Sequence, residues 1–214
     1  LATRCDEAKA RVKDAGLSAL ARSAQQAFRA GDPCRLAVLA SDEADLVAKL
    51  EQARARLASK PDEGYSTPTG VHYATGAGLG SVAFLFPGQG SQYVGMGADV
   101  AMAFSAARAV WDEAAAIRFE GRGVHDVVFP IPVFDDAARQ VQAETLTRTE
   151  WAQPAIGLTS LALLGVVRAA GITPACVGGH SFGEITALTA AGAFDEAGFV
   201  AVARKRGELM RDAS

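Results

Sequence analysis

A serine in the segment Gly179-His180-Ser181-Phe182-Gly183 has the surroundings of a nucleophile. The apolar run 175–178 precedes this segment and the helix-forming run 185–191 follows it, so Ser181 falls where a strand gives way to a helix. In that context the Gly-x-Ser-x-Gly pattern predicts a nucleophile elbow, because two glycines permit the sharp turn that lifts the serine hydroxyl clear of the sheet. The helix that begins there would direct free N–H groups toward an anionic intermediate.

A glycine-rich loop, Pro87 to Gln92, forms a second candidate element of the same site. It follows the apolar run Ser81–Phe86, which predicts a strand buried on both faces of a parallel sheet. The loop lacks both the Gly-Lys-Ser/Thr ending of a phosphate-binding loop and the Gly-x-Gly-x-x-Gly spacing of a dinucleotide site. We therefore do not expect it to bind a nucleotide.

Arg206 is the third candidate residue, because of its place on the last predicted helix, Asp195 to Met210. Helical spacing from Phe199 predicts an apolar stripe with Arg206 in its middle, and it directs Arg204 elsewhere. A buried guanidinium requires an anionic partner. That partner could be an acidic side chain of this chain, or a substrate carboxylate held by two parallel hydrogen bonds. Alternatively, Arg206 lies at the edge of the stripe and its side chain extends to solvent.

These residues need a scaffold, and the order of predicted elements supplies one. Two strands are predicted, Ser81–Phe86 and the one before Ser181, and a buried helix from Pro154 to Ala170 lies between them in the sequence. We expect Cys176, in the second strand, to be a buried core residue. Strand, loop, helices, strand, turn and helix is the order of an α/β, doubly wound domain with a mostly parallel sheet. We expect residues 1–78 to form a small α/β linker subdomain and residues 79–214 to form the α/β domain that contains the Ser181 turn.

Composition excludes several function classes. The chain has 214 residues, a net charge of −3 and no basic tract interleaved with aromatic residues, so we expect no nucleic acid partner. It has no run of about 18 apolar residues, so we expect no membrane partner. Three widely spaced cysteines are more typical of a reducing cytoplasm than of a disulfide framework or zinc site. We expect no metal ion and no cofactor. The first residues predict no secretory signal, and we expect a piece of a longer polypeptide.

Four segments in this order resemble the acyltransferases that load malonyl groups onto acyl carrier proteins. The resemblance covers roughly residues 81 to 214 and is carried by Phe86–Gln92, Gln153-Pro154-Ala155, Gly179–Glu184 and Arg206-Gly207. The preceding residues are similar to the linker that joins a ketosynthase domain to such an acyltransferase in type I synthases. The segments 129–134 and 152–157 are similar to iterative polyketide synthases of the enediyne and polyunsaturated-fatty-acid kind.

The resemblance implies a role for each candidate residue. Ser181 would take malonyl from malonyl-CoA and pass it to the phosphopantetheine thiol of an acyl carrier protein. The backbone N–H groups of Phe182 and Gln89 would form the oxyanion hole. Gln153 would support that site, Arg206 would bind the malonyl carboxylate, and His180 would line the pocket or act structurally. The bulk of Phe182 favours malonyl over branched extender units.

One departure from the resemblance concerns the general base. The family's base is a histidine far downstream of the serine, whereas 33 residues follow Ser181 here and none is histidine. We expect this chain to be the N-terminal portion of the domain, with its C-terminal half elsewhere. Two alternatives remain: a serine hydrolase or thioesterase that shares the elbow, and a non-catalytic scaffold half-domain of a megasynthase.

Overall fold

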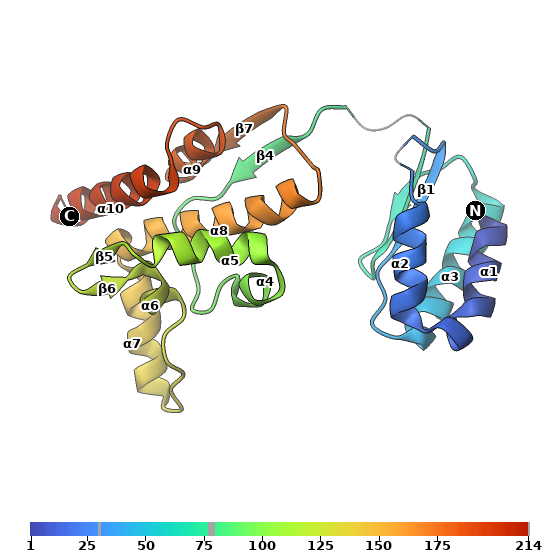
Figure 1. The fold of residues 1–214 in the computed structure, drawn as a ribbon, viewed down its shortest axis with the longest axis horizontal. Helices are drawn as coiled ribbons and strands as arrows, with labels where there is room; N and C mark the ends of the chain where they lie inside the picture. Colours follow the sequence, from blue (N-terminus) through green and yellow to red (C-terminus); the bar gives the residue numbers. More distant parts are fainter. Residues whose placement is uncertain (30, 77–79, 214) are drawn as a thin grey trace. The chain divides into compact units, whose positions relative to one another are not determined.

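The polypeptide divides into two units, Leu1–Gly80 and Ser81–Ser214 (Figure 1). The computed structural model describes residues 1–29, 31–76 and 80–213. The sequence predicts the boundary between the units within Gly76–Gly80, and residues 77–79 of that joint lie outside the described residues.

The first unit packs three helices against a small antiparallel sheet of strand order β1-β3-β2. Its core forms around α3, whose buried residues Leu46, Leu50 and Leu57 recur at helical spacing. Asp42 caps α3 by accepting a hydrogen bond from the Asp45 N–H at 2.8 Å. The elements are α1 (Ala2–Ala15), α2 (Leu17–Ala27), β1 (Cys34–Val38), α3 (Glu43–Ser59), β2 (Tyr65–Ser66) and β3 (Val71–Thr75).

The second unit carries all the candidate residues. Its elements are β4 (Ala83–Phe86), α4 (Ala98–Ala103), α5 (Ser105–Ala114), β5 (Arg118–Phe119), β6 (Arg122–Gly123), α6 (Val124–Val128), α7 (Asp136–Thr147), α8 (Thr149–Ala169), β7 (Cys176–Gly179), α9 (Gly183–Ala190) and α10 (Glu196–Asp212).

Strands β4 and β7 pair in parallel, with Phe86 opposite Gly179. The α/β fold class with a parallel sheet is therefore confirmed. The prediction that both faces of these strands are buried, with Cys176 in the core, is wrong for the described residues. Helix α9 packs on both strands, yet Leu85 is 81% exposed and Cys176 is also exposed. An alternating strand presents its side chains to two faces, and the residues described here cover one of them.

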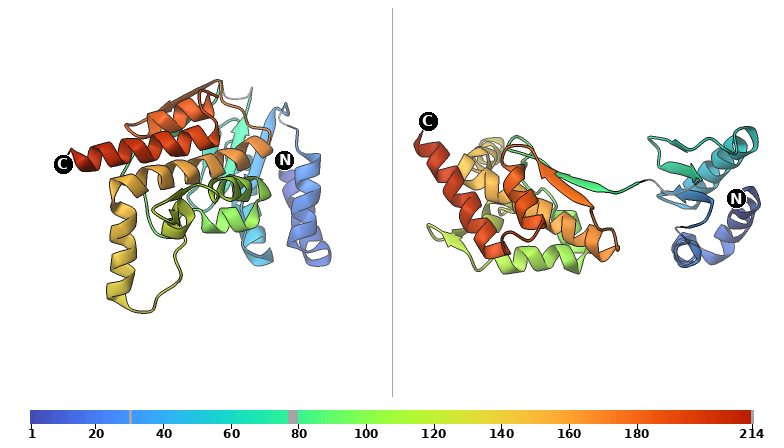
Figure 2. Two further views of the ribbon diagram at one scale, coloured as in Figure 1. Left: turned by 60° about the vertical axis from the view of Figure 1, so that its left-hand side comes forward. Right: turned by 90° about the horizontal axis from the view of Figure 1, so that it is seen from above.

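Helix α8 is the centre of this unit, and α10 runs alongside it (Figure 2). Two glycines of α8 permit close packing: a β-carbon on Gly157 would overlap the Phe199 ring of α10, and one on Gly165 would lie 3.0 Å from the Ala106 carbonyl oxygen of α5. Burying Phe199 completely contributes roughly 2–3 kcal/mol of stability.

The start of α8 differs from the prediction. The helix begins at Thr149, so Pro154 lies inside it rather than in its first turn. α8 is long and apolar enough to cross a membrane, but 61% of that stretch is buried inside the unit. It is packed as a core helix.

Candidate active site

Ser181 occupies a tight turn between β7 and α9. Its φ is 55°, and among the described residues only Glu120 shares a positive φ without being glycine. This backbone conformation is strained for a side chain and persists only where the surroundings impose it. The flanking glycines are required: a β-carbon on Gly179 would overlap the backbone of Gly183, and one on Gly183 would overlap Phe86. The strand–turn–helix context that the motif requires is present.

The loop that follows β4 lies directly against this turn. The His180 N–H donates a hydrogen bond to the Phe86 carbonyl oxygen at 3.2 Å. A β-carbon on Gly88 would lie 2.7 Å from the His180 carbonyl oxygen and 3.5 Å from Cβ of Ser181. Because the backbone approaches so closely at Gly88, the next residue, Gln89, is held near Ser181.

Two backbone N–H groups, one in the turn and one in the loop, have no hydrogen-bond acceptor among the described residues. The N–H groups of Phe182 and Gln89 donate no hydrogen bond within the part of the chain that the structure describes. The Phe182 side chain is fully buried and packs on Phe199, with ring centroids 6.1 Å apart. Phe182 therefore offers only its backbone to the site. Its bulk gives no basis for a preference between malonyl and branched units, because the ring points into the core.

A chain of hydrogen bonds connects Gln153 to the loop. Gln153 is fully buried, and its Nε2 donates to Thr149 Oγ1 at 2.9 Å and to Met210 Sδ at 3.3 Å. The Thr149 hydroxyl donates in turn to Gln89 Oε1 at 2.9 Å. The predicted residues Gln153 and Gln89 are thus joined through one hydroxyl. Thr149 was not predicted, although its position four residues before Gln153 places both on one face of a helix.

The buried arginine of α10 is Arg204, and the predicted placement of Arg206 in the apolar stripe is wrong. Arg204 is 3% exposed, and its Nε donates to Glu208 at 2.7 Å. Its guanidinium also lies 4.6 Å from the Trp151 ring centroid and 4.9 Å from that of Phe119. An acidic side chain and two aromatic rings thus satisfy the buried cation within this chain.

Arg206 is half-buried on another side of α10. It borders a shallow hollow of about 450 Å³ that is lined by Val202, Lys205, Arg206, Leu209, Met210 and Ala213. Within the described residues, no acidic group pairs with Arg206. Met210 of this hollow accepts the hydrogen bond from Gln153. Side-chain contacts therefore connect the Gln89 loop with the hollow that holds Arg206.

The three histidines are placed differently from one another. His180 is exposed, and its Nδ1 lies on the Gly88 side of the turn, 3.2 Å from where a β-carbon on Gly88 would stand. His72 Nδ1 bonds to Ser66 Oγ at 3.0 Å, and His125 Nε2 lies 3.2 Å from an Asp126 oxygen. None of these bonds involves the Ser181 hydroxyl, to which the structure gives no partner among the described residues.

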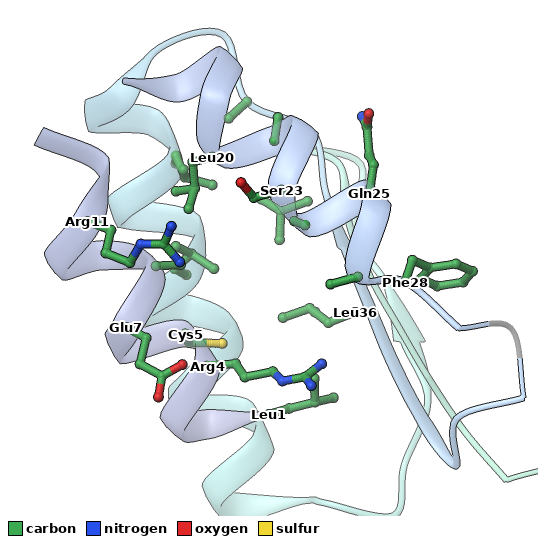
Figure 3. A pocket seen from close by; sticks show the side chains of 18 of the residues that line it. Leu1, Arg4, Cys5, Glu7, Arg11, Leu20, Ser23, Gln25, Phe28 and Leu36 are labelled. Atoms are coloured by element: carbon green, nitrogen blue, oxygen red, sulfur yellow. The ribbon is translucent and has the colours of Figure 1, made fainter. Parts of the chain in front are cut away.

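The first unit contains a separate hollow of about 610 Å³ bordered by α1, α2 and β1. Figure 3 shows the side chains of Arg4, Cys5 and Arg11 of α1 around it. Burial raises the pKa of the Cys5 thiol, which keeps it protonated and a poor nucleophile. Cys5 therefore does not offer this hollow the reactivity suggested for Ser181.

Comparison with known proteins identifies relatives of the second unit. The sequence profile of the family described as "Acyl transferase domain" matches residues 83–214. The malonyl CoA-acyl carrier protein transacylase of Bacillus subtilis (strain 168) is 40% identical over 143 residues, which are 63% of this chain and 39% of that protein. The polyketide synthase GfsA of Streptomyces halstedii is 34% identical over 183 residues, 80% of this chain and 2% of that protein.

A solved structure is similar across both units. The acyl transferase domain of ZmaA is 26% identical, with a TM-score of 0.76 over 95% of this chain and 44% of that one. The chain therefore spans less than half of the length of these relatives.

Proposed function

The chain belongs to the acyl transferase domain family, and we propose from this that it is the N-terminal portion of an acyltransferase that moves malonyl from malonyl-CoA to an acyl carrier protein. The observation that carries the proposal is the strained Ser181 turn, with the unengaged N–H groups of Phe182 and Gln89 beside it. Transacylases of this chemistry are among the relatives.

In the first step, Ser181 Oγ attacks the thioester carbonyl carbon and loses its proton to a general base. The N–H groups of Phe182 and Gln89 stabilise the oxyanion, and each such donor contributes about 3 kcal/mol to the transition state. The C–S bond then breaks, the coenzyme A thiolate takes the proton, and malonyl remains as an ester on Ser181. In the second step the phosphopantetheine thiol of a carrier protein attacks that ester and restores the hydroxyl. We propose that a histidine outside residues 1–214 supplies the base.

We propose that Arg206 binds the free malonyl carboxylate. Its guanidinium has no acidic partner among the described residues, and contacts through Met210, Gln153 and Thr149 connect its hollow with the Gln89 loop. We further propose that His180 lines the entrance to the site, because it is exposed beside Ser181. Gln153 supports the site from the core.

We also propose that the domain works in the cytoplasm, inside a polyketide synthase and next to a ketosynthase domain. The similarity to the polyketide synthase GfsA supports the place inside a polyketide synthase. The similarity to the ZmaA acyl transferase domain covers 95% of the chain and so includes the first unit. The role of that unit as a linker to a ketosynthase domain rests on the sequence resemblance alone. Three free cysteines, Cys5, Cys34 and Cys176, agree with a reducing compartment. The iterative subtype suggested by residues 129–134, and a role in antibiotic biosynthesis, stay predictions.

The test measures the fate of the acyl group. The full-length protein is incubated with malonyl-CoA, with and without a carrier protein, and both the ester on Ser181 and free malonate are quantified. We expect a persistent ester that the carrier thiol discharges. Rapid release of free acid would show a hydrolase or thioesterase instead. An unlabelled Ser181 would show a non-catalytic scaffold.

A further inference from the structure

We infer that Thr149 is a positioning residue that holds the Gln89 loop against Ser181. The inference rests on the proposed function and deepens it. The Thr149 hydroxyl lies between two amides: it accepts from Gln153 Nε2 and donates to Gln89 Oε1, both at 2.9 Å. A hydroxyl has one proton to donate, and here the bond to Gln89 uses it. The direction of this chain of bonds therefore fixes which atom of the Gln89 amide faces Thr149.

The core end of this chain of bonds is rigid. Gln153 is fully buried and also donates to Met210 Sδ, so its amide is held by two acceptors. The first turn of α8 is itself pinned against α10, because a β-carbon on Gly207 would lie 2.6 Å from the Thr149 carbonyl oxygen. Thr149 can move little without displacing two packed helices.

The loop packs against the Ser181 turn at Gly88, but few side-chain hydrogen bonds join it to α8 and α10. The Gly90 N–H donates to Gln92 Oε1 at 2.8 Å, and the Ser91 hydroxyl donates to the Gly88 carbonyl oxygen at 3.1 Å. Both bonds stay within the loop. Among the described residues, the bond from Thr149 is therefore the side-chain hydrogen bond that ties Gln89 to the helices.

The position of Gln89 matters because its N–H is one of the two oxyanion donors. Removing an oxyanion donor altogether lowers a rate by about 100-fold to 1,000-fold. Loosening the donor should cost less than deleting it, because the N–H can still reach the oxyanion in part of the ensemble. We expect a loss of about 10-fold, felt in the chemical step and not in the binding of the substrate.

The experiment compares three variants of the full-length protein. Thr149→Val keeps the shape of the side chain and removes the hydroxyl, and Thr149→Ser keeps the hydroxyl. Thr147→Val is the matched control, because in the described part of the chain the Thr147 hydroxyl bonds within α7, to the Ala143 carbonyl oxygen at 2.9 Å. The rate of Ser181 acylation by malonyl-CoA is measured together with kcat and KM.

We expect Thr149→Val to lower the acylation rate and kcat about 10-fold with KM unchanged. Thr149→Ser should recover most of that loss, and Thr147→Val should match the wild type. A Thr149→Val rate equal to that of the wild type would overturn the inference, as would an equal loss in Thr149→Ser. If the wild type itself forms no ester on Ser181, the proposed function fails, and this outcome is distinct from the failure of Thr149 alone.

Discussion

The α-carbon of Gly88 lies so close to His180 that a β-carbon there would stand 2.7 Å from the His180 carbonyl oxygen. This contact joins the loop after β4 to the turn after β7. The two segments are far apart in sequence and carry the two proposed oxyanion donors. The site therefore depends on Gly88, because the absence of a side chain there lets the two backbones come close together. The need is for space and not for a positive φ.

Gly88→Ala should lower Ser181 acylation about 10-fold to 100-fold, because the added methyl group must push the loop and the Gln89 N–H away from the turn. Gly80→Ala is the control, since a β-carbon at Gly80 would meet no atom of the described residues within 4 Å. The rate is measured with malonyl-CoA on the full-length protein. Equal rates for both variants would show that the loop does not carry an oxyanion donor.

Arg204→Ala should destabilise the fold. The substitution removes a 3% exposed guanidinium and leaves Glu208 with only the longer contact to Lys205 at 3.9 Å, which should cost about 3 kcal/mol. Lys205→Ala, at a neighbouring side chain that is 67% exposed, should change stability by less than about 0.5 kcal/mol. Urea unfolding of both variants checks this. A loss of similar size in the two would contradict the assignment of Arg204 as the buried cation.

Arg206→Ala should change substrate choice and not stability. Loss of two charge-assisted hydrogen bonds to the substrate carboxylate should lower malonyl transfer about 10-fold to 100-fold, while acetyl transfer stays the same or rises. The ratio of the two acylation rates is the measurement. An unchanged ratio would refute carboxylate binding by Arg206, and it would leave the chemistry of Ser181 standing.

Stability should depend on pH through Glu208. The hydrogen bond from Arg204 lowers the pKa of Glu208 below its ordinary value in the folded protein. A lowered folded pKa gives stability that is present above the unfolded pKa and is lost as the pH falls through the folded one. The stability advantage of the wild type over Glu208→Gln should therefore shrink below about pH 4.3. Unfolding curves between neutral and acid pH test this, and a constant difference across that range would contradict it.

The sequence predicts the turn at Ser181 well because its signals are local. Two glycines around a serine, an apolar strand before it and a helix after it leave few conformations for that stretch. The β4 loop is predictable for the same reason, since an apolar run leads directly into glycines. Sequence reasoning therefore predicts the turn and the loop beside it before any packing is known, and the oxyanion roles of Phe182 and Gln89 stay a proposal.

The rotation of α10 could not be read from the sequence. The predicted stripe and the observed buried face share Phe199 and Ala203. The prediction extends from these two toward Val202 and Arg206, whereas the observed face extends to the other side, toward Val200 and Arg204. The close approach at Gly207 decides between them: a β-carbon there would lie 2.5 Å from Cα of Glu150 on α8. That contact turns Arg204 inward and leaves Arg206 half-buried at the hollow.

Thr149 was missed because the predicted helix began five residues too late. Pro154 is favoured in the first turn of a helix, and this preference placed the start there. The tertiary packing of α8 against α10 extends the helix back to Thr149 and brings its hydroxyl to Gln89. Local preference gave way to packing, as it commonly does in core helices.

Intact-mass measurement of the full-length protein after incubation with malonyl-CoA shows whether Ser181 carries the acyl group. Ser181→Ala is the matched control, because alanine removes only the hydroxyl. We expect one malonyl group on the wild type, located on Ser181 by peptide mapping, and none on Ser181→Ala. A wild type without the label, or a Ser181→Ala variant labelled as fully as the wild type, would refute the proposed role of Ser181.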